Sequence, residues 1–169
     1  MRIGVVSDTH DNIEMAKRSG KILRDKGVDM IVHLGDWIAP FTLVELASSF
    51  EGRIVGVYGN NDGEKIGLQR VAPMYNAELY EPPYTLEIDG KRLLLVHGWG
   101  SPEHTREIVE ALASSGRWNA VLYGHTHQAD HRVINGVIVL NPGTASGILN
   151  KPSIAVLDLK DMSVEVIQL

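Results

Sequence analysis

The chain has 169 residues, of which 44% are hydrophobic and 22% are charged, a composition typical of one globular domain. The formal net charge of −5 argues against a general nucleic-acid binder, and the absence of cysteine excludes disulfides, thiolate metal ligands and a cysteine nucleophile. No apolar run approaches the roughly 20 residues that span a bilayer, and the first residues show no signal peptide pattern, so we expect a cytoplasmic protein without membrane contact.

Segments typical of strands and helices alternate in the first half of the chain, which indicates an α/β domain. Buried strands are predicted at residues 2–6, 30–34 and 54–58. Apolar residues at helical spacing predict a helix over about 12–26, which Gly27 ends. Pro40 fits the first turn of a second helix that runs to about Phe50.

Short strands joined by tight turns dominate the second half of the chain. Asp89-Gly90 and Asn135-Gly136 each predict a β-hairpin. The predicted elements are one helix at about 102–115 and strands at 85–88, 92–96, 120–123, 132–134, 137–140, 154–158 and 164–167. Neither a repeat nor a linker interrupts the pattern, so we expect a single domain over residues 1–169, built as a two-sheet sandwich with helices outside.

Side chains that can bind metal ions follow five of the predicted strands. They are Asp8 and His10 after the first strand, Asp36 after the second, Asn60 after the third, His97 after the first hairpin, and His125 and His127 after the strand at 120–123. Strand ends of an α/β sheet open onto one crevice, and rigid strands fix the loops that follow them. We therefore expect these seven oxygen and nitrogen donors to meet at one site.

The spacing within this set supports a cluster. Asp8-Thr9-His10 and His125-Thr126-His127 each place two donors two positions apart. In an extended chain such donors point to one face, so each pair is expected to clasp one site. Taken alone, each feature is as well explained by a turn or a helix cap, and only the ordered combination indicates a metal centre.

The ordered set Asp-x-His, Gly-Asp, Gly-Asn, His-Gly and Gly-His-x-His, together with Asn141-Pro142-Gly143-Thr144, resembles the calcineurin-like metallophosphoesterase superfamily. Within it, the short chain looks like the compact archaeal and bacterial phosphodiesterase branch. The resemblance implies an α/β fold in which two mixed β-sheets pack as a sandwich flanked by helices. It also implies a metal-dependent phosphodiesterase that acts on small phosphate esters.

The resemblance further implies a ligand set for two divalent ions. Asp8, His10, Asp36 and His127 would bind one ion, and Asp36, Asn60, His97 and His125 the other, with Asp36 bridging. Paired ions can acidify a shared water and hold the phosphate, so we expect direct attack by a metal-bridging hydroxide without a covalent enzyme intermediate. The family favours Mn²⁺ or Ni²⁺, while the imidazole and carboxylate donors also suit Zn²⁺, Fe²⁺ and Co²⁺.

Position 61 departs from the pattern of many superfamily members, which carry there a histidine thought to assist the leaving group. This chain has Asn61 instead. An amide cannot donate a proton as an acid, so we assign no catalytic side chain beyond the metal-bound hydroxide. Short members of the branch often lack the histidine as well.

Several residues near the predicted ligands are assigned supporting roles. Asp11 and Asp62 are expected to accept hydrogen bonds from the ligand histidines. Trp37 and Trp99 each follow a ligand and are expected either to wall the substrate pocket or to pack their loops. His33 is interpreted as a packed, hydrogen-bonded strand residue.

Two other functions compete with the phosphodiesterase. A non-catalytic protein-binding scaffold on the same fold would be expected to have lost ligand positions, yet all seven are intact. A nuclease of the same superfamily would be expected to carry capping domains and a basic surface. The sequence leaves open the natural substrate, the native metal, whether the protein forms a homo-oligomer, and what protonates the leaving group.

Overall fold

The computed structural model describes residues 1–169 and contains four α-helices, one short 3₁₀ helix and eleven strands. The helices are α1 (Ile13–Asp25), α2 (Pro40–Phe50), α3 (Lys65–Val71) and α4 (Pro102–Ser114), and the 3₁₀ helix is Ala72–Tyr75. The strands are β1 (Arg2–Val6), β2 (Met30–His33), β3 (Arg53–Val57), β4 (Ala77–Tyr80), β5 (Tyr84–Ile88), β6 (Lys91–Leu95), β7 (Ala120–Leu122), β8 (Ala129–Ile134), β9 (Val137–Pro142), β10 (Ser153–Asp158) and β11 (Ser163–Gln168). No helix combines the length and the apolar character that crossing a bilayer requires.

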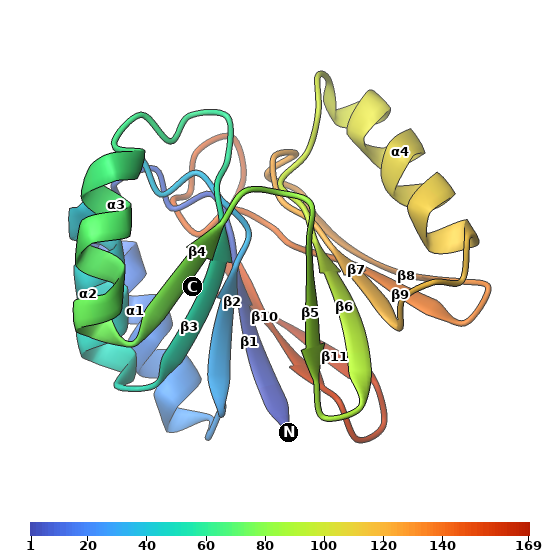
Figure 1. Ribbon diagram of the computed structural model, residues 1–169, viewed down its shortest axis with the longest axis horizontal. Coiled ribbons are helices and arrows are strands. Elements are labelled where there is room, and N and C mark those ends of the chain that lie inside the picture. The colour runs from blue at the N-terminus through green and yellow to red at the C-terminus, as the bar shows by residue number, and fades with distance from the viewer.

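The strands form two facing sheets. Six make the first sheet, in the order β11-β10-β1-β2-β3-β4, and five make the second, in the order β5-β6-β7-β9-β8. Both sheets mix parallel and antiparallel pairs. Helices α1, α2 and α3 cover the outer face of the first sheet and α4 covers that of the second (Figure 1). The predicted class, an α/β sandwich of two mixed sheets flanked by helices, is confirmed.

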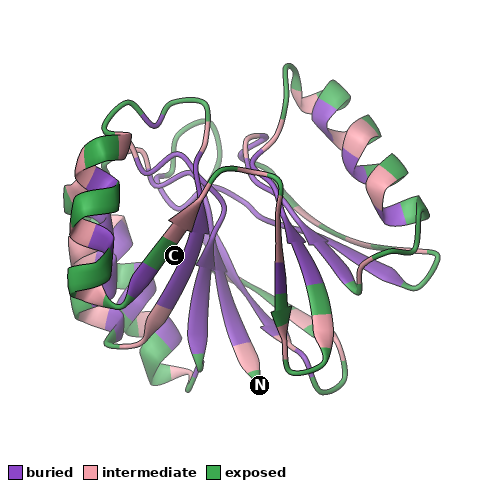
Figure 2. Cartoon of the chain, viewed as in Figure 1, coloured by how far each residue is buried: buried purple, intermediate pink, exposed green.

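Strand β1 is buried along nearly all of its length (Figure 2), and the alternation of its side chains explains how one strand serves two cores. Ile3 and Val5 belong to the core between the sheets, whereas Val6 packs in the core beneath the helices. Between them, Gly4 faces α1. A Cβ atom there would lie 2.7 Å from a methyl carbon of Leu23, so glycine permits α1 to approach the sheet closely.

The structure adds three elements that the sequence pattern does not indicate: α3, the 3₁₀ helix and β4. Helix α3 buries only Leu68, so it has little apolar periodicity. Strand β4 lies at a sheet edge, and only Ala77 in it is buried. Strand β8 is also an edge strand, and it begins at Ala129 rather than at position 132 because its first residues lack the apolar alternation of a half-buried strand.

The topology brings the ends of five strands to one end of the sandwich. Strands β1, β2 and β3 are parallel, so their carboxyl ends share one edge of the first sheet. Strands β6 and β7 do the same in the second sheet. The loops that follow these strands gather at the upper end of the molecule in Figure 1. All seven predicted metal ligands lie on these loops.

Candidate metal centre

Five of the seven predicted ligands have a left-handed backbone. The angle φ is 54° at Asp8, 43° at His10, 59° at Asp36, 67° at His125 and 58° at His127. Such conformations cost a non-glycine residue about 1–3 kcal/mol and persist where the surroundings fix them, which is typical of functional sites. The backbone at positions 8, 10, 125 and 127 is therefore not extended, and the expectation of extended segments is wrong.

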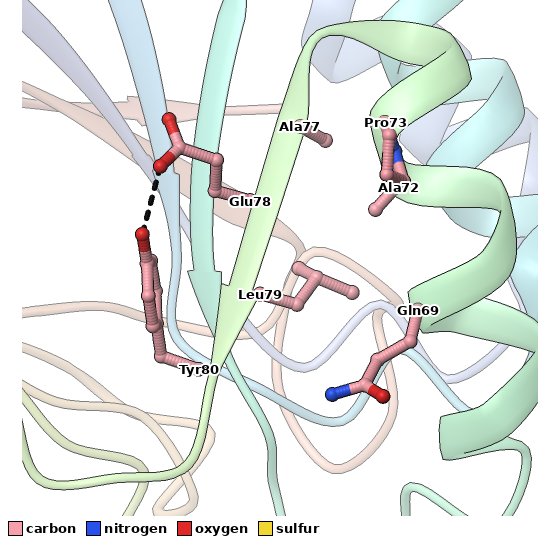
Figure 3. A pocket seen from close by; sticks show the side chains of 7 residues that line it. All are labelled: Gln69, Ala72, Pro73, Ala77, Glu78, Leu79 and Tyr80. Atoms are coloured by element: carbon pink, nitrogen blue, oxygen red, sulfur yellow. Dashed lines mark hydrogen bonds between the residues drawn. The ribbon is translucent and has the colours of Figure 1, made fainter.

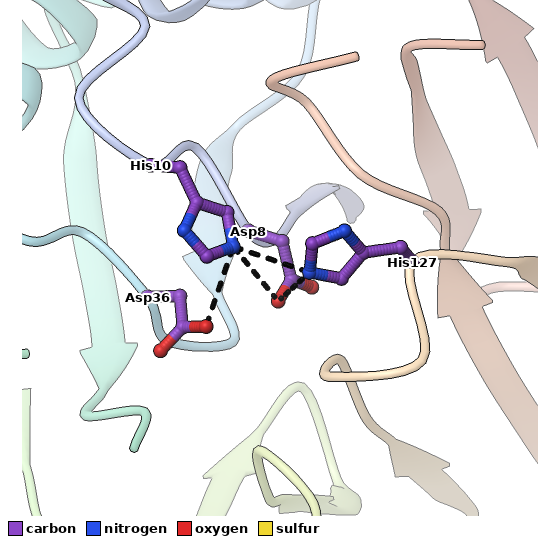
Figure 4. A group of neighbouring side chains, drawn as sticks. All are labelled: Asp8, His10, Asp36 and His127. Atoms are coloured by element: carbon purple, nitrogen blue, oxygen red, sulfur yellow. Dashed lines mark hydrogen bonds and ion pairs between the residues drawn. The ribbon is translucent and has the colours of Figure 1, made fainter. Parts of the chain in front are cut away.

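Asp8, His10, Asp36 and His127 form a first group, with one candidate ligand atom from each lying within 4.8 Å of the others. His10 Nε2 lies 3.1 Å from His127 Nε2, and Asp8 Oδ1 lies 3.3 Å from His127 Nε2. Figure 4 shows the two imidazoles and the two carboxylates converging, Asp8 and His10 from the loop after β1, Asp36 from the loop after β2 and His127 from the loop after β7. The structure thus brings together the residues that the family resemblance assigns to one ion.

Asn60, His97 and His125 form a second group. Asn60 Oδ1 lies 3.0 Å from His97 Nε2 and 3.0 Å from His125 Nδ1. His125 and His127 are consequently split between the two groups, and the expectation that this pair clasps one site is wrong. The split matches the division of ligands that the resemblance implies.

Asp36 contacts both groups through one oxygen. Its Oδ2 lies 3.4 Å from His10 Nε2 and 3.5 Å from His97 Nε2. Burial opposes ionisation of this carboxyl, but hydrogen bonds from His97 and Asn61 outweigh burial and hold its pKa well below the usual range. The carboxylate therefore stays ionised at neutral pH, with one oxygen placed between the two groups.

The carboxylates in turn raise the pKa of two histidines. The adjacent carboxylate of Asp8 raises the pKa of His127. Burial alone would lower the pKa of His97, but Asp36 and Asp8 outweigh it and the net shift is upward. Protons therefore compete with a metal ion for these imidazoles.

Asp8 provides an independent indication that the first group suits a cation. Its Oδ2 accepts hydrogen bonds from Ser7 Oγ at 2.6 Å and from the backbone N–H of His125 at 3.1 Å. Its Oδ1 is buried and has no hydrogen-bond partner. A buried carboxylate oxygen without a donor is costly, and a divalent ion among Asp8, His10 and His127 would satisfy it. The residues present fit a metal ion.

Backbone carbonyls orient three of the four ligand histidines. His97 Nδ1 lies 2.7 Å from Leu34 O, His125 Nε2 lies 2.7 Å from Gly100 O, and His127 Nδ1 lies 3.1 Å from Ile148 O. Each of these ring N–H groups donates to its carbonyl, so in the neutral imidazole the other ring nitrogen carries a lone pair that it can offer to a metal ion.

Asp11 and Asp62 do not contact these histidines, which corrects the expectation that they support them. Three of the four histidines, all except His10, already donate to backbone carbonyls, so those three need no carboxylate acceptor. Asp11 instead accepts a hydrogen bond of 3.0 Å from Thr42 Oγ1 on α2. Asp62 accepts hydrogen bonds from backbone N–H groups of the loops that carry Asp36 and Asn60.

Asp62 ties the loops after β2 and β3 together. Its carboxylate accepts from the backbone N–H groups of Asp36 at 3.1 Å, Ile38 at 2.7 Å and Gly59 at 2.6 Å. The residue is only 7% exposed. It therefore positions the backbone of the bridging aspartate and holds the turn that presents Asn60.

Replacing Asp62 with alanine should weaken both the fold and the metal centre. Three backbone N–H groups, one buried and two partly buried, would lose their acceptor, so we expect the free energy of unfolding to fall by about 2–4 kcal/mol. Metal affinity should fall about 10- to 100-fold, the usual range for losing a supporting contact around a metal site. Urea unfolding and calorimetric metal titration measure the two effects. Asp25→Ala, at an exposed helix end, is the control, and equal results for both variants would contradict this role.

Asn61 holds the bridging carboxylate. Its backbone N–H donates to Asp36 Oδ1 at 2.9 Å, and its side-chain Nδ2 donates to Asp36 Oδ2 at 2.8 Å. The sequence does not indicate this double contact. The amide places a hydrogen-bond donor at the centre but no group that can act as an acid.

The two tryptophans have different positions. Trp37 is 0% exposed, stacks on the buried His33 with ring centroids 3.5 Å apart, and donates to Val57 O at 3.1 Å. It packs in the core and does not wall a substrate pocket. Trp99 is 36% exposed, and its backbone N–H and carbonyl both bind Thr105 Oγ1. Of the two, only Trp99 can reach a substrate.

A cavity of about 310 Å³ lies beside β4 (Figure 3). It is lined by Gln69, Ala72, Pro73, Ala77, Glu78, Leu79 and Tyr80. The Tyr80 hydroxyl donates to Glu78 at 2.7 Å along its rim. None of the predicted site residues borders this cavity, so it adds nothing to the candidate site.

The fold and the two joined groups of carboxylate, amide and imidazole donors are those expected of a metallophosphoesterase. Residues 1–162 match the model of the calcineurin-like phosphoesterase superfamily domain. The chain therefore belongs to the calcineurin-like phosphoesterase superfamily, and the predicted family and enzyme class are confirmed at that level.

Individual relatives agree with this assignment. The chain is 33% identical over 160 residues to a phosphodiesterase of Methanocaldococcus jannaschii, covering 94% of this chain and 93% of the relative. A solved structure of an archaeal phosphodiesterase superposes with a TM-score of 0.90 at 31% identity, covering all of both chains. The fold is also similar to that of Vps29 from Chaetomium thermophilum, with a TM-score of 0.71 at 16% identity over 100% of this chain and 93% of the other.

Proposed function

We propose that this protein is a dinuclear, metal-dependent phosphodiesterase that hydrolyses small phosphate esters by direct attack of a hydroxide shared between two divalent ions. The observation that carries the proposal is the position of Asp36 Oδ2, within 3.5 Å of imidazole nitrogens from both ligand groups. The phosphodiesterase relatives support the reaction class.

The chain's own contribution is to hold the metal ions and to orient the groups around them. Two bound divalent ions would supply an acidified water and would grip the phosphate oxygens. Asp8, His10 and His127 would hold one ion, while Asn60, His97 and His125 would hold the other, and Asp36 would bridge them. The two carboxylates and one hydroxide would leave the centre with a charge of about +1, which suits a diester monoanion better than a monoester dianion.

The proposal is tested with metal-stripped protein. Each of Mn²⁺, Ni²⁺, Zn²⁺, Fe²⁺ and Co²⁺ is added separately, and a linear diester, a cyclic nucleotide and a monoester are assayed. We expect diester turnover that rises until two ions are bound per chain, counted by atomic emission. Full activity with one ion per chain would overturn the dinuclear arrangement. Two bound ions without turnover of any ester would favour the protein-binding scaffold.

The amide at position 61 affects which leaving groups the enzyme can expel. With no acid near the departing oxygen, aryl diesters should be far better substrates than alkyl diesters. Asn61→His should selectively improve esters with poor leaving groups, because a positioned general acid contributes about 10²–10⁴ in rate. Rates plotted against leaving-group pKa for parent and variant measure this. A parent plot that is already flat, with chemistry rate-limiting, would mean that another residue supplies the proton.

We further infer that the enzyme works in the cytoplasm on small molecules rather than on nucleic acid polymers. The net charge of −5 supports this substrate range, because polymer binding depends on cationic contacts to phosphates. Tight DNA binding that weakens steeply with salt would contradict it and favour the nuclease. Sedimentation of the metal-loaded protein would determine whether it forms a homo-oligomer.

A further inference from the structure

A second, polar cavity of about 350 Å³ lies beside the metal centre. It is lined by His127, Gln128, Ala129, Asn150, Lys151, Ser153 and Gln168. These residues come from the loop after β7, the start of β8, the segment before β10 and the end of β11. His127 is shared between the two sites, because its Nε2 faces Asp8 while the residue also borders the cavity. The cavity and the metal centre are thus separated by one residue.

The charges of the residues that line the cavity are those expected of an anion-binding site. Lys151 contributes a permanent positive charge, and no carboxylate lines the wall, although the chain as a whole carries −5. Some cations of the chain are neutralised by ion pairs, as Lys26 is by Glu165 and Arg132 by Glu110. Lys151 is exposed, and none of the chain's ion pairs involves it. Its ammonium group is therefore free to bind a ligand.

Neutral donors accompany the lysine. Gln128, Asn150 and Gln168 place side-chain amides in the wall. The carbonyl oxygen of Gln128 accepts a hydrogen bond from Arg106 on α4, which leaves its NH₂ group available to a ligand and brings a second cation close to the cavity. This combination of amide donors and cations is typical of sites that bind phosphate or carboxylate groups.

The wall that carries Lys151 is anchored at both ends. Ile148 O accepts the hydrogen bond from His127 Nδ1, so the segment is attached to a metal ligand. Pro152 O accepts from the backbone N–H of Leu169, and Ser153 Oγ donates to Pro142 O at 2.7 Å. The backbone on either side of Lys151 is therefore fixed relative to the metal centre.

We propose that this cavity is a specificity subsite for an anionic group on the organic part of the substrate, a phosphate in particular, with Lys151 as its main binding residue. The inference rests on the proposed function, since it places the scissile phosphate at the ions and the second anion beyond His127. It narrows the substrate class to diesters that carry an additional phosphate.

The test compares two ligands that differ by one phosphate, thymidine 5′-phosphate and thymidine 3′,5′-bisphosphate. Both are used as inhibitors of aryl diester hydrolysis by the metal-loaded protein. For the parent we expect the bisphosphate to inhibit about tenfold more strongly, the scale of one charge-assisted hydrogen bond. Lys151→Ala should reduce this ratio to about twofold or less, and Lys151→Arg should preserve it. Lys160→Ala, in the exposed turn after β10 at the opposite end of the sheet, should leave it unchanged.

The outcomes separate this inference from the proposed function. A ratio that Lys151→Ala leaves unchanged, or a loss of affinity equal for both ligands, would overturn the subsite. If the metal-loaded parent hydrolyses no diester, the proposed function fails, and calorimetric titration of the same two ligands still decides whether the subsite exists. In that titration, a preference for the bisphosphate that depends on Lys151 supports the subsite, and equal affinity for both ligands contradicts it.

Discussion

Removing the bound metal ions should abolish diester hydrolysis. The side chains at the centre are assigned to hold the metal ions, and none of them is assigned to activate water. We therefore expect turnover to fall more than about 10³-fold, toward the uncatalysed rate. Activity should return when a divalent transition metal is added to the stripped protein. A chromogenic aryl diester provides the rate, and elemental analysis provides the ion content of the same samples.

Stability should change with the ions as well. Without a cation, Asp8 Oδ1 stays buried without a partner, so the stripped protein should unfold at a lower temperature. A metal present at about 100 times its dissociation constant adds about 2.7 kcal/mol to the free energy of unfolding. Chelator already saturated with the same metal is the control. Undiminished turnover by protein with no detectable metal would disprove the mechanism.

The layout of the centre could be predicted from the sequence because it follows from strand direction. Asp8, Asp36 and Asn60 each follow a strand rich in Val and Ile, and parallel strands place their carboxyl ends together. The same rule brings His97 and His125 together in the second sheet. Buried strands have strong apolar patterns, so this part of the prediction needed no knowledge of loop conformation.

The local geometry could not be predicted in the same way. Whether His125 and His127 share one site depends on the conformation of their loop, which the spacing of the residues does not fix. Both pairs have left-handed φ values, yet Asp8 and His10 join one group while His125 and His127 join different groups. The acceptors of three of the four ligand histidines are backbone carbonyls, which every residue has and which leave no trace in residue identity. Asp62 was singled out as a supporting carboxylate, but its actual partners are backbone N–H groups.

Helix α3 and strand β4 were missed for a different reason. Both lie at the margin of the fold, where few side chains are buried, so their sequences lack the periodic apolar residues that indicate an element. Pairing of β4 with β3 forms this edge of the sheet. Hydrogen bonds with a neighbour, rather than burial, define this part of the structure.

Asp36→Asn should be among the most damaging single substitutions in the chain. An amide has one acceptor oxygen and no charge, so it cannot bridge two ions or neutralise them as the carboxylate does. Its NH₂ group would also face one of the two donors that now bind Asp36, either the backbone N–H or Nδ2 of Asn61. Losing one preorganised electrostatic group typically costs about 10²–10³ in rate, and we expect a loss of kcat/KM at or above this range.

Metal content and turnover measured together separate the possible causes. The variant should bind fewer than two ions per chain, and kcat should fall more than KM rises, because the lost interaction acts on the reacting hydroxide and phosphate. Asp25→Asn, at the exposed end of α1, is the matched control, and circular dichroism verifies that both variants fold. Two ions per chain with parental kcat in Asp36→Asn would mean that another ligand joins the two groups. The single carboxylate oxygen that contacts both His10 and His97 would then be a result of packing alone.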